Sequence, residues 1–133
     1  MYVWAVNRGL AAKTKVYTYF WDHTLPGPDA ALYGAFHTSE VPYVMNSLAM
    51  SARPFVEADR KIADVMSSYW ANFIRTGDPN GKGLAHWPAI GERPETTMEL
   101  GDKAATIPVT GDKAKLTFFE AYFGKPRGGQ PPR

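Results

Sequence analysis

The sequence predicts an α/β fold from three segments with different patterns. Residues 16–21 (VYTYFW) are rich in β-branched and aromatic types, which favours a strand. Residues 55–76 place apolar side chains at the three- and four-residue spacing of an amphipathic helix. Residues 97–109 hold two short strand-like runs around Gly101-Asp102-Lys103, which is typical of a hairpin. At 133 residues the chain has the size of one domain.

The composition indicates a globular chain and excludes several kinds of site. With 44% hydrophobic and 14% aromatic residues, the sequence has enough apolar material for a core. The excess charge of +2 is concentrated at Lys125, Arg127 and Arg133, which is too little and too local to predict binding to nucleic acid or a membrane surface. Because the sequence has no cysteine, it excludes a disulfide and a thiolate metal site.

No segment of the sequence predicts membrane insertion or export. No apolar run approaches the roughly 18 residues of a membrane span. No signal peptide begins at Met1. The compartment is therefore unknown, and a cytoplasmic parent protein and a secreted one both fit.

The elements before residue 30 are a helix, a strand and a turn. Residues 3–12 show a helical apolar stripe that Gly9 weakens, as in a helix that covers a core. The strand at 16–21 does not alternate apolar with polar residues, which suits a strand covered on both faces. Asp22-His23-Thr24 ends this strand, and residues 25–29 (LPGPD) favour a turn without regular structure.

The elements after residue 42 are mainly helical. A short apolar turn is expected over residues 43–50, and the long helix at 55–76 ends before Gly77, as helices commonly do. The apolar stripe of this helix is expected to pack in the core and comprises Ile62, Val65, Met66, Tyr69, Trp70, Phe73 and Ile74. Residues 116–123 predict a last amphipathic helix, and residues 124–133 a disordered tail.

The candidate site is a loop around His37, within LYGAFHTSEVPYV at residues 32–44. Thr38 or Ser39 can cap a following helix, which would place His37 on the loop just before it, a position that suits a general base. The loop lies shortly beyond the C-terminal end of a predicted strand, where sites form in open α/β sheets. On spacing alone, a structural or surface role is the commoner interpretation of a lone histidine.

Two neighbours of His37 carry further expectations. Gly34 has no side chain, so it allows close approach of the backbone. Glu40 follows His37 by three residues. It either caps the following helix together with a preceding Ser or Thr, or orients a neighbouring group, and capping is the commoner role.

The remaining candidate chemistry is weak. His23 could join His37 and Glu40 in a metal site of nitrogen and oxygen ligands. No His-x-x-x-His or similar spacing supports such a site, so we predict no metal and no cofactor. His86 is interpreted as a packing or surface residue. The sequence also lacks a Gly-x-Ser-x-Gly nucleophile elbow, a phosphate-binding glycine loop, and a Rossmann or Walker motif.

Four stretches, in the same order and spacing, together resemble the C-terminal portion of the type-B carboxylesterases, the cholinesterase and para-nitrobenzyl esterase family of α/β-hydrolases. The stretches are VYTYFW at 16–21, YGAFHTSEVPY at 33–43, YWANFIRTGDPN at 69–80 and HWP at 86–88. The resemblance covers about residues 2–123. It implies a late sheet strand, a catalytic-histidine loop, a long helix, a small hairpin and a terminal helix. Residues 1–123 would form this part of the fold, followed by the tail at 124–133.

The resemblance implies that His37 is the histidine of a Ser-His-acid triad. Glu40 matches the acidic position that follows the histidine in the family, and it is not the family's triad acid. We expect Glu40 to support the site from behind the histidine. The substrate implied is a carboxylic ester, and no cofactor is implied.

The family's triad serine, triad acid and glycine-rich oxyanion segment lie upstream in the family, and none has a counterpart in this sequence. Met1 is therefore expected to begin well inside the fold. We expect the chain alone to lack esterase activity and to self-associate through the exposed edge of the strand at 16–21. The alternative is a non-catalytic interaction module that keeps the cholinesterase-like scaffold.

Overall fold

A computed structural model describes residues 2–123 of the chain. Its larger elements in chain order are α1 (Tyr2–Ala11), β1 (Tyr19–Trp21), α4 (Glu57–Thr76), β2 (Thr96–Leu100), β3 (Ala104–Pro108) and α5 (Lys113–Phe123). Between β1 and α4 lie the short helices α2 (Ala30–Tyr33) and α3 (Val41–Val44) and a 3₁₀ turn at Leu48–Met50. Across the described residues, no helix has both the length and the apolar character needed to cross a membrane.

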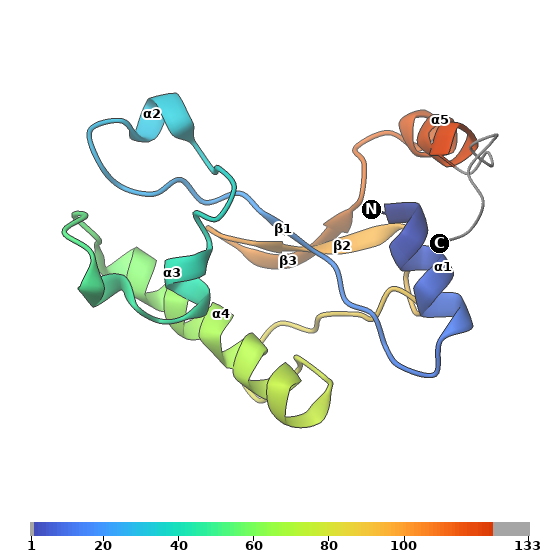
Figure 1. Cartoon of the computed structure of the whole chain (residues 1–133), viewed down its shortest axis with the longest axis horizontal. Helices are drawn as coiled ribbons and strands as arrows, with labels where there is room; N and C mark the ends of the chain where they lie inside the picture. Colours follow the sequence, from blue (N-terminus) through green and yellow to red (C-terminus); the bar gives the residue numbers. More distant parts are fainter. Residues whose placement is uncertain (1, 124–133) are drawn as a thin grey trace, which may run out of the picture.

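The strands form one sheet in the order β1-β2-β3. β1 runs parallel to β2, with Tyr19 opposite Met98 and Trp21 opposite Leu100, whereas β2 and β3 form an antiparallel hairpin. The parallel pair is joined by a long crossover that contains α2, α3 and α4. In Figure 1 the sheet lies at the centre, with α4 below it, α2 on one side and α1 and α5 on the other. This mixed sheet with helices agrees with the predicted α/β class.

The core lies between α4 and one face of the sheet. Ala63, Met66 and Tyr69 of α4 are buried. They belong to one cluster with Leu25, Tyr43, Leu48, Trp87, Met98 and Leu100. The apolar stripe of the helix therefore packs as its spacing predicted, although Phe73 and Ile74 at its end are exposed.

Alternate residues of the β1 segment face α4. The rings of Tyr17 and Phe73 lie 5.9 Å apart, and those of Tyr19 and Trp70 lie 5.2 Å apart, both edge to face. Phe20 points to the opposite face of the sheet, where it is 55% exposed. The expectation that this strand is covered on both faces therefore does not hold within residues 2–123, because α4 packs on one face.

β1 has one hydrogen-bonded neighbour in the described part of the chain. The N–H of Met98 donates to the carbonyl of Thr18 at 3.1 Å, and the N–H of Asp22 donates to the carbonyl of Leu100 at 3.3 Å. Because backbone groups alternate in direction along a strand, the N–H and C=O of Tyr19 and Trp21 point to the other edge. The sheet described by the structure ends at that edge.

Most predicted elements are present, with shifted boundaries. The long helix begins at Glu57, the terminal helix begins at Lys113, and the hairpin lies where it was predicted. The strand predicted at 16–21 is shorter, at Tyr19–Trp21, although the extended Val16 still accepts a hydrogen bond from Ile90 N–H at 2.8 Å. The short helix α2 was not predicted. The tail expected at 124–133 lies outside the described residues.

Candidate catalytic histidine loop

His37 lies on the loop that joins α2 to α3, beyond the C-terminal end of β1, and its side chain is exposed. The helix α2 ends at Gly34, whose φ of +53° and ψ of −142° favour glycine. No atom lies within 4 Å of the position that a Cβ of Gly34 would occupy. The glycine is therefore needed for its backbone conformation, and the close approach expected from the sequence is absent.

The backbone forms a tight turn immediately around His37. Thr38 has a φ of +71°, in the left-handed region that threonine rarely adopts. Its hydroxyl donates to the carbonyl of His37 at 2.5 Å, and the N–H of Ser39 donates to the carbonyl of Phe36 at 3.0 Å. The turn directs the chain from the exposed histidine back toward the core at Ser39.

Ser39 does not cap the following helix, contrary to expectation. Its side chain is buried, and its hydroxyl oxygen accepts a hydrogen bond from the indole Nε1 of Trp21 at 2.7 Å. The N-cap position of α3 is held by Glu40, which makes no side-chain capping bond. Capping by Thr38 or Ser39, and by Glu40 in the Ser/Thr-x-x-Glu sense, is therefore wrong. The helix α3 has four residues, and Pro42 within it has no N–H to cap.

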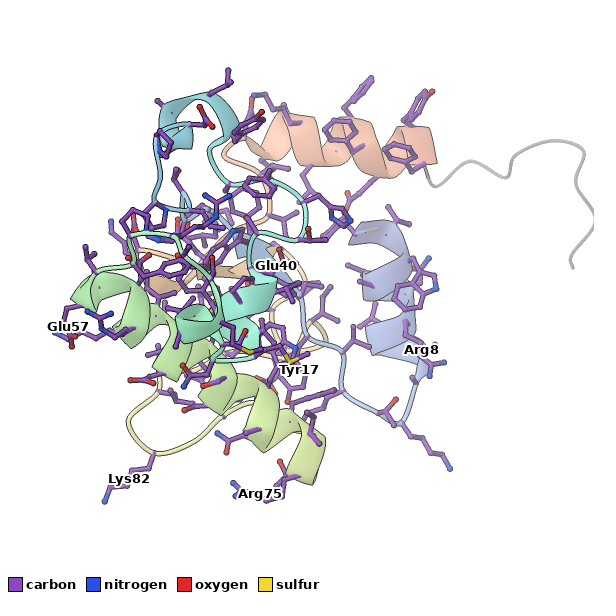
Figure 2. All side chains as sticks on the ribbon, turned by 60° about the vertical axis from the view of Figure 1, so that its left-hand side comes forward. Arg8, Tyr17, Glu40, Glu57, Arg75 and Lys82 are labelled. Atoms are coloured by element: carbon purple, nitrogen blue, oxygen red, sulfur yellow. The ribbon has the colours of Figure 1, made fainter. Side chains whose placement is uncertain are left out.

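Glu40 lies behind the loop, close to β1. Burial raises the pKa of the Tyr19 hydroxyl, and the neighbouring Glu40 carboxylate raises it further. Figure 2 shows Glu40 at the start of α3 in the body of the molecule, whereas Glu57, Arg75 and Lys82 project outward. In the described residues, no side-chain hydrogen bond joins Glu40 to His37. Glu40 is thus placed toward the strand.

A polar cluster lies near this loop and centres on the buried side chain of Asp59, in the first turn of α4. Asp59 is 2% exposed. Its Oδ1 accepts a hydrogen bond from the Tyr43 hydroxyl at 2.6 Å and lies 2.9 Å from His23 Nε2, while its Oδ2 accepts from the N–H of Val56 at 2.8 Å. His23 Nδ1 lies 2.6 Å from Asp102 Oδ1, in the turn between β2 and β3. The cluster therefore joins α3 and α4 to the segment that follows β1 and to the hairpin turn.

The pKa values in this cluster follow from burial and hydrogen bonding. Burial by itself would raise the pKa of the Asp59 carboxyl, but the hydrogen bonds from Tyr43, from the Val56 N–H and from His23 hold it below its ordinary value. Burial, followed by the hydrogen bond to Asp59, raises the pKa of the Tyr43 hydroxyl far above its ordinary value. The cluster therefore holds a charged carboxylate and a neutral phenol.

The sequence did not reveal the partners of His23. The sequence offers His23 as a partner of His37 and Glu40 in a metal site, but the structure places it between Asp59 and Asp102, which are 36 and 79 residues away along the chain. No group of three His, Asp or Glu side chains arranged to hold a metal ion occurs among residues 2–123. No local sequence pattern could have found these long-range contacts.

The third histidine lies at the surface. His86 is exposed, and its Nε2 lies 3.8 Å from Glu92 Oε2. This agrees with the packing or surface role expected from the sequence, and His86 lies in none of the contacts that shape the loop of His37.

The chain matches known carboxylesterases over most of its length. The carboxylesterase family model matches residues 2–119. Human cocaine esterase is 39% identical over 67 residues, which cover 50% of this chain and 12% of that protein. Phenmedipham hydrolase of Pseudarthrobacter oxydans is 30% identical over 103 residues, which cover 73% of this chain and 21% of that protein. The chain thus spans a small part of the length of these relatives.

Solved esterase structures share the arrangement of elements. The carboxylesterase EST55 of Geobacillus stearothermophilus superposes with a TM-score of 0.57 and 29% identity, over 77% of this chain and 21% of its own. An esterase of Clostridium hathewayi that can hydrolyse aliphatic aromatic polyesters gives a TM-score of 0.66 at 24% identity, over 88% of this chain and 21% of its own, which shows the shared fold. With its late sheet strand, histidine loop, long helix, hairpin and terminal helix, this chain belongs to the carboxylesterase family and has part of the α/β-hydrolase fold.

Proposed function

We propose that residues 1–123 supply the catalytic histidine and the late part of the sheet to a carboxylic-ester hydrolase. The observation that carries this proposal is the position of His37, exposed on a tight loop beyond the C-terminal end of β1 in a chain of the carboxylesterase family. In α/β proteins, sites form outside the carboxyl ends of the sheet strands. The ring of His37 is thus free to meet a serine and a substrate.

In this proposal His37 moves one proton in each half of the reaction. Its imidazole accepts the hydroxyl proton of a serine as the serine oxygen attacks the ester carbonyl, and the resulting imidazolium gives that proton to the leaving alkoxide. A water then loses a proton to the same imidazole as it attacks the acyl-enzyme, and the serine regains the proton when the acid product leaves. The serine, the triad acid and the oxyanion donors have no counterpart in this sequence.

The chain alone is expected to be inactive as an esterase. In a serine hydrolase, loss of a triad member costs orders of magnitude in rate, and here the nucleophile, acid and oxyanion donors are all without a counterpart. Hydrolysis of para-nitrophenyl acetate by the chain should not exceed that of free imidazole. His86→Ala, which removes another exposed imidazole, is the matched control for His37→Ala. Turnover that His37→Ala and a serine-directed inhibitor both abolish would overturn this expectation.

A chimera tests the role of His37 directly. The part of residues 2–123 that superposes on the Geobacillus carboxylesterase would replace its counterpart in that enzyme, so that a serine, an acid and an oxyanion hole surround the loop. We expect ester hydrolysis that His37→Ala reduces by orders of magnitude and that His86→Ala leaves unchanged. A well-folded chimera whose rate does not depend on His37 would refute the proposed function.

Glu40 has a supporting role in this proposal. Its carboxylate raises the pKa of the Tyr19 hydroxyl, which places its charge at the start of α3 close to the strand that precedes the loop. Glu40→Gln in the chimera should lower the rate far less than His37→Ala does. A loss as large as that of His37→Ala would instead indicate direct participation of Glu40 in the proton transfers.

We further propose that the free edge of β1 pairs with a second copy of this chain. The N–H and C=O groups of Tyr19 and Trp21 point to that edge, and neighbouring Phe20 leaves an apolar ring exposed. Light scattering should show dimers or larger species. Tyr19→Pro removes a donor from the free edge and keeps the bonds to β2, so it should shift the population toward monomer. A wild-type chain that is monodisperse as a monomer would contradict the proposal.

The non-catalytic alternative is favoured by the exposed apolar side chains, among them Leu32, Tyr33, Met45, Met50 and Ile74. Such a surface suits an interaction module as well as an enzyme segment. The chimera separates the two, since hydrolysis dependent on His37 requires the histidine to be in working position. A structural module would show no such dependence.

A further inference from the structure

The loop of His37 has one side-chain anchor in the sheet. Ser39 is 1% exposed, although His37 and Thr38 beside it are exposed. Its hydroxyl accepts the indole N–H of Trp21 at 2.7 Å. Among the described residues, the other hydrogen bonds of residues 35–40 are local, within the loop and to the first residues of α3. The hydrogen bond from Trp21 therefore joins the loop to the strand.

The donor of this bond is itself held in place. Trp21 lies in β1 opposite Leu100, so its backbone is fixed in the sheet. Its ring lies 5.0 Å from that of Tyr43 and 5.6 Å from that of His23. Tyr43 and His23 both bind Asp59 in the first turn of α4. The direction of the indole N–H is thus set by a strand, two rings and a buried carboxylate.

The acceptor, Ser39, lies close enough in the chain to set the backbone conformation next to His37. Ser39 is two residues from His37, and the residue between them, Thr38, has a left-handed φ of +71°. That conformation is unfavourable for threonine, so it persists where the surrounding contacts enforce it. The bond to Ser39 holds one end of this turn, and without it Thr38 can relax to an ordinary conformation. The relaxation would rotate His37 on its backbone.

We infer that Trp21 and Ser39 form a positioning pair for His37, in which the indole N–H fixes Ser39 and through it the turn that presents the imidazole. This inference rests on the proposed role of His37 as the general base. Positioning matters for such a base, because a displacement of about 1 Å can cost roughly 100-fold in rate. Neither Trp21 nor Ser39 touches a reacting atom, so both act through His37.

The test uses the full chain and NMR. The variants are Ser39→Ala, Trp21→Phe and the double substitution, with Ser68→Ala, an exposed serine of α4, as the matched control. The readouts are the backbone chemical shifts and ¹⁵N relaxation of His37 and Thr38. We expect each single variant to shift His37 and Thr38 toward random-coil values and to raise their mobility. The double variant should do no more than Trp21→Phe alone, because the bond that Ser39→Ala removes is already lost with the indole N–H.

Three results would overturn the positioning pair. They are unchanged His37 and Thr38 signals in Ser39→Ala, additive effects in the double variant, or an equal effect of Ser68→Ala. If Trp21→Phe fails to fold, 3-benzothienylalanine at position 21 keeps the ring shape and replaces the N–H by sulfur. These NMR signals do not depend on catalysis. Loss of activity of the chimera on His37→Ala tests the proposed function separately, so the two can fail independently.

Discussion

His23 joins the end of β1 to the first turn of α4, with its Nε2 2.9 Å from Asp59 Oδ1. The other ring nitrogen lies 2.6 Å from Asp102 Oδ1 in the hairpin turn. The imidazole therefore bridges two carboxylates that lie on different elements. The Tyr43 hydroxyl binds the same oxygen of Asp59, so the two contacts together hold α3, α4 and the end of β1 in place next to the loop of His37.

Asp59→Asn should destabilise the chain strongly. The buried carboxylate binds Tyr43, His23 and the N–H of Val56, and an amide of the same shape would turn its NH₂ toward one of these donors. We expect a loss of about 2–4 kcal/mol in the free energy of unfolding. Urea denaturation followed by tryptophan fluorescence measures it. Asp64→Asn, at an exposed position of the same helix, should change stability by less than about 0.5 kcal/mol.

The same carboxylate predicts a loss of stability in acid. Its hydrogen bonds hold the pKa of Asp59 below its ordinary value of 3.8 in the folded chain. A depressed folded-state pKa contributes stability that is fully present above 3.8 and is lost as the pH falls through the folded value. The difference in stability between the wild type and Asp59→Asn should therefore shrink below pH 3.8. A difference that stays constant down to pH 2 would show that Asp59 does not titrate as expected.

Asp22 should affect the stability of the chain in the opposite direction to Asp59. Partial desolvation of the carboxyl, and then the neighbouring Glu99 carboxyl, raise the pKa of Asp22. Its charged form is therefore unfavourable at neutral pH, and protonation relieves that cost as the pH falls through the raised value. Asp22→Asn should stabilise the chain at pH 7, by less than about 1 kcal/mol because Asp22 is exposed to solvent. Thermal unfolding of the wild type and of Asp22→Asn at pH 7 and pH 4 measures the gain in stability and its decrease in acid. A variant that is less stable than the wild type at pH 7 would contradict this reasoning.

The sequence predicted the parts of this structure that depend on local pattern. The spacing of apolar residues gave the long helix to within two residues of its start, and the Gly101-Asp102-Lys103 turn located the hairpin. The motif around His37 predicted a loop before a short helix, and His37 lies on the loop between α2 and α3. These features are encoded in neighbouring residues, so periodicity and turn chemistry suffice to find them.

Contacts between distant residues could not be predicted in this way. Ser39 lies two residues after a histidine and two before an apolar run, which favours a helix cap, yet its hydroxyl accepts from Trp21, a partner 18 residues earlier. Asp59 lies in the first turn of α4, where an acidic side chain suits the helix dipole, but its burial beneath Tyr43 and His23 depends on how α3 and β1 pack. In both cases tertiary packing supplied a better partner than the local backbone.

Gly101→Ala should disrupt the junction between the hairpin and β1. A Cβ at Gly101 would meet the side chain of Asp22 and, at 2.9 Å, the backbone nitrogen of His23. Backbone atoms cannot rotate away, so the strand end and the turn would have to separate. We expect a loss of about 1–3 kcal/mol in the free energy of unfolding. Gly111→Ala is the matched control, because nothing lies within 4 Å of its Cβ position. Equal effects of the two substitutions would refute the steric argument.

Tyr43→Phe should remove the phenol that binds Asp59 and leave the ring packing intact. The lost donor leaves a buried carboxylate less satisfied, which should cost about 1–3 kcal/mol at neutral pH. Burial and Asp59 raise the pKa of Tyr43 above its ordinary value of 10.0, so its contribution is fully present below pH 10 and is lost as the pH rises toward the folded value. The difference between the wild type and Tyr43→Phe should therefore narrow above pH 10. Other buried tyrosines, including Tyr69, titrate in both proteins and cancel in that difference. A difference in stability between the two proteins that widens above pH 10 would show that the hydroxyl is not held neutral by Asp59.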